Sequence, residues 1–315
     1  MSSTNLVNFS LRQNKSIERM IVFDCIASVM RALDLRSTVY VGFGSVWFAD
    51  FIIAHRLLGI RDMVSIERDE ITFKRAQFNR PYKTVEVIKG DSSDVIPDLL
   101  DRQELSARPW IVWLDYDNEI DEAKLAELVR LMQSLPPNSF LITTFSALAG
   151  RYGNIASRPE FISGLFAKAA PETLDPLAYR NQDDLMRILA ESTENYLVSQ
   201  AIDSARPGSF LPAVQLTYRD SMPMVTVGGV LPAPENEEAV KRLVSGPEWP
   251  GRAFEIIQVP PLTPREVLAL QSHLPSMEGL TREDVVKMGF DLKKEQLDAF
   301  VDHYLRYPQF AQVAQ

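Results

Sequence analysis

The chain has 315 residues, of which 46% are hydrophobic and 24% charged, as in a folded globular protein. Its 33 Lys and Arg against 42 Asp and Glu give a net charge of −9, which disfavours a nucleic acid or an anionic membrane as partner. The lone Cys25 excludes an internal disulfide and a cysteine-rich zinc site. The start resembles no signal peptide and no apolar run reaches a membrane span of roughly 18 residues, so we expect a cytoplasmic protein.

The first half of the chain alternates between helical and extended patterns. Residues 16–33 carry apolar side chains at helical spacing, with Ser16 as the expected N-cap. Short apolar runs then predict strands at residues 38–43, 63–67, 84–89, 110–115 and 138–145. Between them, helices are expected at residues 45–58, 70–78, 92–100 and 121–133. This alternation predicts an α/β fold built from right-handed βαβ units on a parallel sheet.

The second half follows a different pattern. Residues 146–180 form a glycine- and proline-containing excursion, where substrate contacts are common, and a helix is expected at 182–203. Strands at 213–219 and 224–230 predict a hairpin. The tail is expected to be mainly helical, at 264–273, 281–288 and 293–305, with one strand at 253–259. We therefore predict an N-terminal helical segment at 1–35, a core domain at 36–232 and a C-terminal region at 233–315.

Glycines follow the first predicted strand, in the sequence Gly42-Phe43-Gly44. Glycines between a strand and a helix let the backbone approach a ligand at the helix N-terminus. The dinucleotide fingerprint would need another glycine where Trp47 stands, so that match is incomplete. A turn that only reverses the chain remains the alternative interpretation.

Acidic residues stand at the ends of the next three strands. Glu67, followed by Arg68, ends the second strand and could accept the hydroxyls of a ribose. Asp91 and Ser92 follow the third strand and could contact an adenine, although either is also a good N-cap. Ligands bind at this edge of open α/β sheets. The fourth strand ends in three polar residues, Asp115, Tyr116 and Asp117.

Taken together, these features resemble the class I S-adenosylmethionine-dependent methyltransferases over residues 36–230. The resemblance implies a Rossmann-like seven-stranded sheet, mostly parallel with an antiparallel edge hairpin. More narrowly, residues 11–19 (LRQNKSIER) and 113–117 (WLDYD) are similar to the bacterial family named "putative O-methyltransferases". The cofactor-binding residues implied are Gly42, Phe43, Gly44, Glu67, Arg68, Asp91, Ser92 and Asp115.

The chain departs from that family pattern at two positions. Tyr40 stands where an acid is common, and Val46 replaces the third glycine of the loop. The polar segment around Lys15 offers a compensation, because a cation there could neutralise the carboxylate of the cofactor's methionine part. The alternative is an ordinary helix start with solvated charges.

Methyl transfer to oxygen gains from a base near the acceptor, and Asp115 and Asp117 are the candidates, with Tyr116 shaping the pocket. The chain has no Asn-Pro-Pro-Tyr-like run, which weakens a nitrogen acceptor. Oxygens of Asp115, Asp117 and Asn118 could bind a cation, but residues 143–146 (TTFS) lack the further ligands, so no metal is predicted. The acceptor itself stays unidentified.

Two other functions remain open. A catalytically silent module of the same fold could act through a protein partner. A nicotinamide-dependent oxidoreductase would fit Gly42, Gly44 and Glu67, although the predicted hairpin argues against it. In the tail, an apolar stripe at helical spacing is expected to pack on the core domain or against a partner or second copy; it comprises Leu297, Phe300, Val301 and Tyr304.

Overall fold

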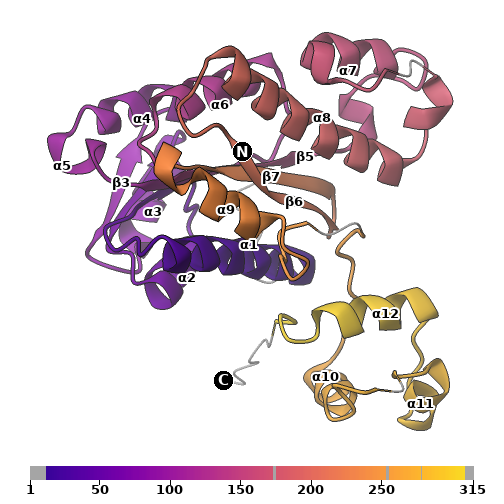
Figure 1. Ribbon diagram of the computed structural model, residues 1–315. Helices are drawn as coiled ribbons and strands as arrows, with labels where there is room; N and C mark the ends of the chain where they lie inside the picture. Colours follow the sequence, from indigo (N-terminus) through magenta and orange to yellow (C-terminus); the bar gives the residue numbers. More distant parts are fainter. Residues whose placement is uncertain (1–11, 173–174, 253–254, 278, 309–315) are drawn as a thin grey trace.

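The computed structural model describes residues 12–172, 175–252, 255–277 and 279–308 (Figure 1). Seven strands form one sheet in the order β3-β2-β1-β4-β5-β7-β6. The first five pair in parallel, and β7 runs antiparallel to both β5 and β6. The sheet predicted from the sequence is therefore confirmed. Its strands are β1 (Val39–Gly42), β2 (Asp62–Glu67), β3 (Val85–Lys89), β4 (Trp110–Asp115), β5 (Ser139–Ser146), β6 (Leu211–Arg219) and β7 (Pro223–Leu231).

Helices cover both faces of the sheet, each over its own hydrophobic core (Figure 1). One face carries α1 (Gln13–Ala32), α2 (Ala49–Leu58), α3 (Glu70–Asn79) and α9 (Glu237–Val244). The other carries α4 (Ser92–Leu100), α5 (Gln103–Ser106), α6 (Glu122–Ser134), α7 (Arg158–Phe166) and α8 (Gln182–Asp203). Because side chains alternate along a strand, Trp113 and Asp115 of β4 both project toward α1.

The start of α1 differs from the prediction. The helix begins at Gln13, with Arg12 at the N-cap position, so the expected cap at Ser16 is wrong. Asp220, in the turn between β6 and β7, accepts hydrogen bonds from the backbone N–H groups of Asn14 and Lys15 instead. A carboxylate satisfies the free N–H groups of a helix start as well as a local serine would. Leu11, the first residue of the N-terminal motif, lies outside the described residues.

The connection from β1 to α2 is longer than expected, because α2 starts at Ala49 rather than at residue 45. Ser45 and Phe48 adopt left-handed backbone conformations, with φ of 50° and 49°. Residues with a Cβ rarely adopt this conformation, and it is incompatible with a continuing right-handed helix. The loop of residues 43–48 therefore stands at the carboxyl end of β1, beside the ends of β2 and β4.

The tail contains the three expected helices, α10 (Pro264–Gln271), α11 (Arg282–Lys287) and α12 (Lys294–His303). The strand expected at 253–259 is wrong for its described part, residues 255–259, which makes one isolated bridge, from Ile257 to Tyr218 of β6. Residues 253–254 lie outside the described part. Arg306 pairs with Asp24 of α1 at 2.7 Å, which ties the tail to the body.

Short 3-10 turns complete the fold, and two of them flank α7 in the excursion after β5. They are η3 (Ala149–Arg151), η4 (Ala167–Ala169), η5 (Pro176–Tyr179) and η6 (Pro234–Asn236). Within the described residues, no helix is both long and apolar enough to cross a membrane.

Candidate functional site

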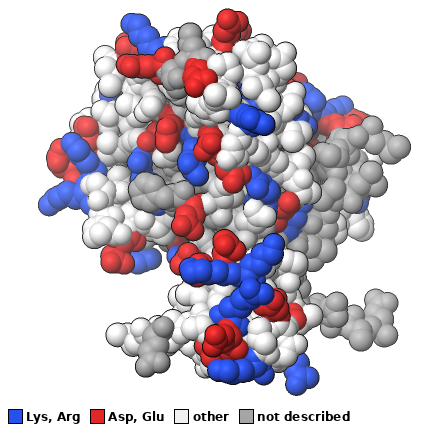
Figure 2. Space-filling model, turned by 90° about the vertical axis from the view of Figure 1, so that its right-hand side faces the viewer, with Lys and Arg blue, Asp and Glu red and all other residues white. Residues whose placement is uncertain are grey.

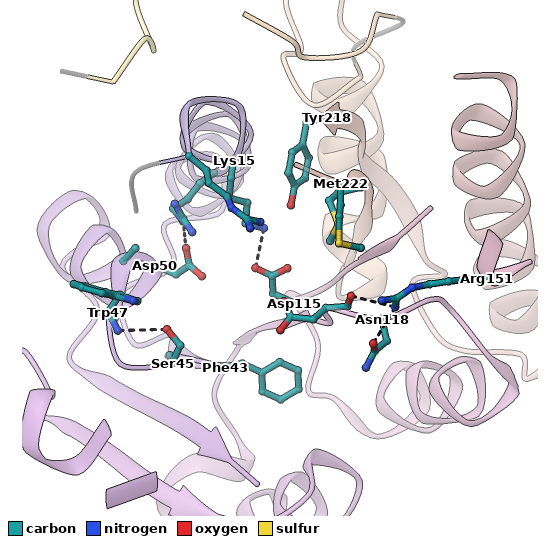
Figure 3. A pocket seen from close by; sticks show the side chains of 16 residues that line it. Lys15, Phe43, Ser45, Trp47, Asp50, Asp115, Asn118, Arg151, Tyr218 and Met222 are labelled. Carbon is teal, nitrogen blue, oxygen red and sulfur yellow. Dashed lines mark hydrogen bonds and ion pairs between the residues drawn. The ribbon is translucent and has the colours of Figure 1, made fainter. Parts of the chain in front are cut away.

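A cavity of about 300 Å³ opens at the carboxyl ends of β1 and β4 (Figure 3). Its wall comes from six parts of the chain: the start of α1, the loop after β1, the start of α2, the end of β4 with the residues after it, the turn after β5 and the β6–β7 hairpin. The sheet order places the carboxyl ends of β1 and β4 side by side. An edge of this kind is where open α/β sheets bind ligands.

The two glycines of the loop are required by close packing. A Cβ on Gly42 would lie 2.9 Å from the backbone oxygen of Trp113, and one on Gly44 would lie 2.7 Å from both the Phe48 ring and the Ser65 hydroxyl. The Gly44 N–H donates to that hydroxyl, at 3.1 Å. The glycines thus hold the loop tightly against β2 and β4, and Gly44 and Phe43 also line the cavity.

Lys15 is a buried cation at the cavity floor. Only 3% of the residue is exposed, so the interpretation as a solvated charge is wrong for this position. Its Nζ lies 2.8 Å from Asp115 Oδ2 and 3.3 Å from Glu18 Oε2. It also lies 5.0 Å from the ring centre of Trp113. Burial opposes the charge, but Asp115 and Glu18 together hold the pKa of Lys15 well above its usual value.

A chain of hydrogen bonds in the interior runs from the Trp113 indole, which lies beside Lys15, to the Glu18 carboxylate. The Trp113 Nε1 donates to Thr144 at 3.0 Å, and the hydroxyls of Thr144 and Thr226 are 2.8 Å apart. Thr226 donates to Glu18 Oε1 at 2.6 Å. Burial raises the pKa of the Glu18 carboxyl to about 7, against the opposing effect of Lys15. We call the six residues Trp113, Thr144, Thr226, Glu18, Lys15 and Asp115 the polar ring.

Asp50 supplies a carboxylate that the glycine motif itself lacks. Tyr40, at the position where the resemblance described above implies an acid, is buried and packs edge-on against Phe51 with ring centres 5.0 Å apart. Asp50 of α2 lines the cavity instead and pairs with the buried Arg19 of α1. Asp50 was not among the predicted site residues, because nothing in the helical pattern of residues 45–58 distinguishes it.

Four further predicted residues lie at the same edge of the sheet, outside the cavity wall. Glu67 is the last residue of β2 and Arg68 follows it, while Asp91 and Ser92 come after β3. The Ser45 backbone donates a hydrogen bond to the Glu67 carboxylate, while Oε1 of Glu67 is buried and has no partner among the described residues. Burial raises the pKa of Glu67 to about 7. A buried carboxylate oxygen without a partner can accept a hydrogen bond from a hydroxyl group of a ligand.

Asp91 stands at the N-cap position of α4, but in the described chain its side chain makes no capping bond. Its carboxylate lies 3.6 Å from the exposed Arg68 guanidinium. Ser92, the next residue in the chain, is 8% exposed. The Asp91 side chain therefore does not cap α4, as the alternative interpretation of this residue had required.

The three polar residues after β4 separate. Asp115 and Asp117 line the cavity, whereas the Tyr116 hydroxyl donates to Glu127 of α6 at 2.8 Å, away from it. The Tyr116 ring packs edge-on against Phe43, with ring centres 5.5 Å apart. Tyr116 therefore packs against the loop after β1 through Phe43. Among the described residues, no group of three or more His, Cys, Asp or Glu side chains gathers as a metal site would require.

The hairpin and the excursion contribute cavity residues that the sequence did not single out. Tyr218, Met222 and Met224 come from the β6–β7 hairpin, and Arg151 follows β5. Figure 3 shows Arg151 reaching Asn118, at 2.9 Å from its Oδ1. The hairpin itself was predicted, but its position over the cavity depends on the sheet order.

Among solved structures, the chain is similar to the O-methyltransferase from Bacillus cereus in complex with SAH, with 13% identity over 65% of this chain and 78% of that chain and a TM-score of 0.37. It is similar to the plantazolicin methyltransferase BpumL in complex with SAH, with 10% identity over 68% and 84% of the two chains and a TM-score of 0.41. A LepI variant in complex with SAH and substrate analogue gives 11% identity, 64% of this chain and a TM-score of 0.36, and the chain spans 46% of its length. Likenesses this low carry no argument about function.

The sequence itself gives a firmer result. No curated protein sequence matches the chain. The sequence profile of the family described as "Putative O-methyltransferase" matches residues 7–315, nearly the whole chain. The match confirms the family and the class of enzyme expected from the residues, and it gives no support to a catalytically silent module. The chain belongs to the "Putative O-methyltransferase" family of S-adenosylmethionine-dependent methyltransferases.

Proposed function

We propose that the protein transfers a methyl group to an oxygen of its acceptor in the cavity between α1 and the carboxyl ends of β1 and β4. One observation carries the proposal: three features converge at one edge of the sheet. They are the tight glycine loop, the buried Glu67 oxygen that has no partner in the described chain, and the cavity carboxylate of Asp115. Each feature alone has an ordinary structural explanation. Their convergence at the ligand-binding edge does not.

The described residues fit S-adenosylmethionine, which supplies a methyl group activated by a positively charged sulfur. We propose that Glu67 accepts the ribose hydroxyls, since its Oε1 is buried without a partner in the described chain. Asp91 and Ser92 would then contact the adenine, with Arg68 at the rim. The backbone of Gly42, Phe43 and Gly44 would border the cofactor where the loop meets the cavity.

The methionine part would lie over the cavity floor. Lys15 was expected to bind its carboxylate directly, but the Lys15 ammonium is already shared by Asp115 and Glu18. We therefore propose that Lys15 acts through Asp115, by holding that carboxylate in place at the floor. Arg12, which also lines the cavity, is the cation that we propose for the methionine carboxylate.

The same floor suits proton removal from an oxygen acceptor. As the carbon–oxygen bond forms, the carbon–sulfur bond breaks with its electron pair left on sulfur, and the acceptor loses its proton. Asp115 and Asp117 line the cavity and are the proposed proton acceptors. Their main contribution, with the cavity wall, is to hold the acceptor oxygen in line with the methyl group.

Calorimetric titration with S-adenosylhomocysteine tests cofactor binding. We expect the wild type to bind and the Glu67→Ala variant to lose binding; unchanged affinity in that variant would contradict the proposed ribose contact. The acceptor atom is tested by supplying methyl-labelled S-adenosylmethionine together with a cell extract. Label found in an alkali-stable methyl ether identifies a hydroxyl acceptor, as the proposed proton removal requires. Label released as methanol by alkali identifies a carboxylate acceptor, which contradicts the proposed base, and label that stays on nitrogen contradicts an oxygen acceptor.

We further propose a cytoplasmic protein whose helices α10 to α12 contact a second copy or a protein partner. Exposed apolar residues there include Leu268 at 62% and Val286 at 54% exposure. On the face in Figure 2, acidic and basic side chains are interspersed, as expected of a surface that does not track a nucleic acid. Sedimentation of the full chain tests the contact with a second copy; a monomer at all concentrations would contradict a dimer and leave a different protein as the proposed partner.

A further inference from the structure

Glu18 is the one member of the polar ring that is fully buried, charged and yet outside the cavity wall. The residue has 0% exposure, and its carboxylate is separated from the cavity by Lys15. Nothing in the proposed chemistry uses it. Burying a carboxylate costs desolvation free energy. We therefore ask what effect Glu18 has on the charges around it.

The direction of the hydrogen bonds in the ring fixes Glu18 as an acceptor. The Trp113 Nε1 can only donate, so the Thr144 hydroxyl oxygen accepts this hydrogen bond. The O–H of Thr144 can then donate to another acceptor. Thr226 donates to Glu18, and therefore accepts from Thr144. The chain from the indole thus ends on a Glu18 oxygen, an arrangement that stabilises the ionised carboxylate.

Ionised Glu18 leaves the cavity floor with one negative charge in excess. In the described chain, Arg19 of α1 and Asp115 of β4 are the charged groups that act on both Glu18 and Lys15, and Asp50 of α2 pairs with Arg19. Two cations then stand against three carboxylates. Tyr218 of β6 and Tyr40 of β1 also face the group, but burial raises the pKa of both hydroxyls, so they stay neutral.

Charges at the cavity mouth do not cancel this excess. Arg151 lies 2.9 Å from the Glu119 carboxylate, and the remaining mouth residues Arg12 and Asp117 carry opposite charges. These groups are more exposed than the floor and are screened by water. The floor is buried, where a charge acts over a longer distance.

We propose that Glu18 is a positioning residue that, through Lys15 and Asp115, makes the cavity floor negative and so selects a sulfonium ligand over the uncharged thioether. The proposal rests on the proposed function, since it requires the sulfur of the cofactor to lie over the floor. S-adenosylmethionine and S-adenosylhomocysteine differ by one methyl group and one positive charge. A negative floor favours the donor and disfavours retention of the product.

The Glu18 carboxyl gains its proton near neutral pH, because burial raises its pKa to about 7. Below that pH the floor is neutral, and above it the floor is negative. Affinity for the sulfonium should therefore rise with pH through this interval, on the order of tenfold for one charge at effective dielectric ~20. By linkage, binding the cation should also expel the Glu18 proton near pH 7.

The experiment is calorimetric titration with S-adenosylhomocysteine and with sinefungin, a cationic analogue that transfers no methyl group, at pH 6, 7 and 8. In the wild type we expect the preference for sinefungin to grow about tenfold from pH 6 to pH 8. Titrations at pH 7 in two buffers of different ionisation enthalpy should show proton release on binding sinefungin. The ligands' own amino groups also titrate, so the decisive comparison is with Glu18→Gln, in which we expect both effects to be lost.

Two further variants keep the test decisive. Thr226→Val removes the hydroxyl that donates to Glu18, so the pH at which the preference appears should move upward even if Glu18→Gln folds poorly. Glu194→Gln is the matched control: burial raises the pKa of Glu194 as well, but Glu194 pairs with Arg252 outside the cavity. It should behave as the wild type.

A preference that is independent of pH in the wild type, or that persists unchanged in both Glu18→Gln and Thr226→Val, would overturn the proposal. Wild-type protein that binds neither ligand would instead show that the proposed function is wrong, and the inference would fall with it. Binding of both ligands with the same pH dependence leaves the proposed function intact and rejects the role of Glu18 alone.

Discussion

The Asp220 carboxylate caps the first turn of α1 by accepting the backbone N–H groups of Asn14, at 3.2 Å, and Lys15, at 3.1 Å. The Asn14 side chain in turn donates to the Arg219 oxygen at 2.7 Å and accepts from the Val259 N–H at 2.8 Å. The β6–β7 hairpin, α1 and the segment around Val259 therefore meet at the buried Asn14. This junction fixes where Lys15 enters the cavity floor.

Replacing Asp220 by Ala should lower the free energy of unfolding by about 1–2 kcal/mol, because two N–H groups of α1 lose their acceptor. It should also weaken binding of S-adenosylhomocysteine, since the start of α1 carries Lys15. Urea denaturation and calorimetry measure the two effects. Thr263→Ala, which removes the cap of α10 far from the cavity, should lose stability but keep the affinity. Equal affinities in the two variants would contradict the role of the junction.

The Lys15→Met variant should be destabilised by about 3–5 kcal/mol at pH 8, because Glu18 and Asp115 are left as neighbouring carboxylates without their shared cation. Without Lys15 the pKa of buried Glu18 rises further, so the folded state binds more protons than the unfolded state and stability falls as pH increases. The loss should be clearly smaller at pH 5.5. Urea denaturation at the two pH values measures it.

The second variant for this prediction is Lys15→Met combined with Glu18→Gln. Removing one of the two carboxylates should restore part of the stability at pH 8, so the two substitutions should be non-additive. Additive losses would show that Lys15 and Glu18 do not interact as the 3.3 Å contact indicates.

Glu67→Gln should bind S-adenosylhomocysteine less well and yet unfold at higher urea concentration at pH 8. In the folded protein the pKa of Glu67 is raised from 4.5 to about 7, so stability falls as pH rises between those values. Glutamine removes that dependence and retains an oxygen for the Ser45 N–H. Denaturation at pH 5 and pH 8 measures the difference, and an identical pH dependence in wild type and variant would contradict it. Glu18 keeps its own share of the dependence, so the slope should shrink rather than vanish.

Gly44→Ala should cost about 1–3 kcal/mol, because the new Cβ would lie 2.7 Å from the Phe48 ring and the Ser65 hydroxyl. Gly164→Ala is the matched control. That glycine lies inside α7, and apart from the neighbouring backbone of its own helix nothing lies within 4 Å of the new Cβ, so alanine should be neutral or add up to ~1 kcal/mol. Thermal denaturation of both variants measures the contrast. A loss in Gly164→Ala as large as in Gly44→Ala would show that the cost does not come from crowding.

The sequence by itself determined the elements and which residues stand at the ends of the strands. Apolar runs of strand length fixed β1 to β5, and the polar residues after them, such as Glu67 and Asp115, had to fall at one edge because the strands are parallel. These features depend on neighbours along the chain. Periodicity and local turn chemistry are therefore sufficient to predict them.

Tertiary structure decided which of these residues interact. Thr226 meets Glu18 across 208 residues of sequence, and Asp220 caps a helix that begins more than 200 residues before it. Tyr116 was expected beside its neighbours Asp115 and Asp117, but its hydroxyl turns to Glu127 on the opposite face of the sheet. Such pairs depend on the order of the strands and on which face each helix covers. Local sequence does not encode either, so the charge of the cavity floor became visible only in the folded chain.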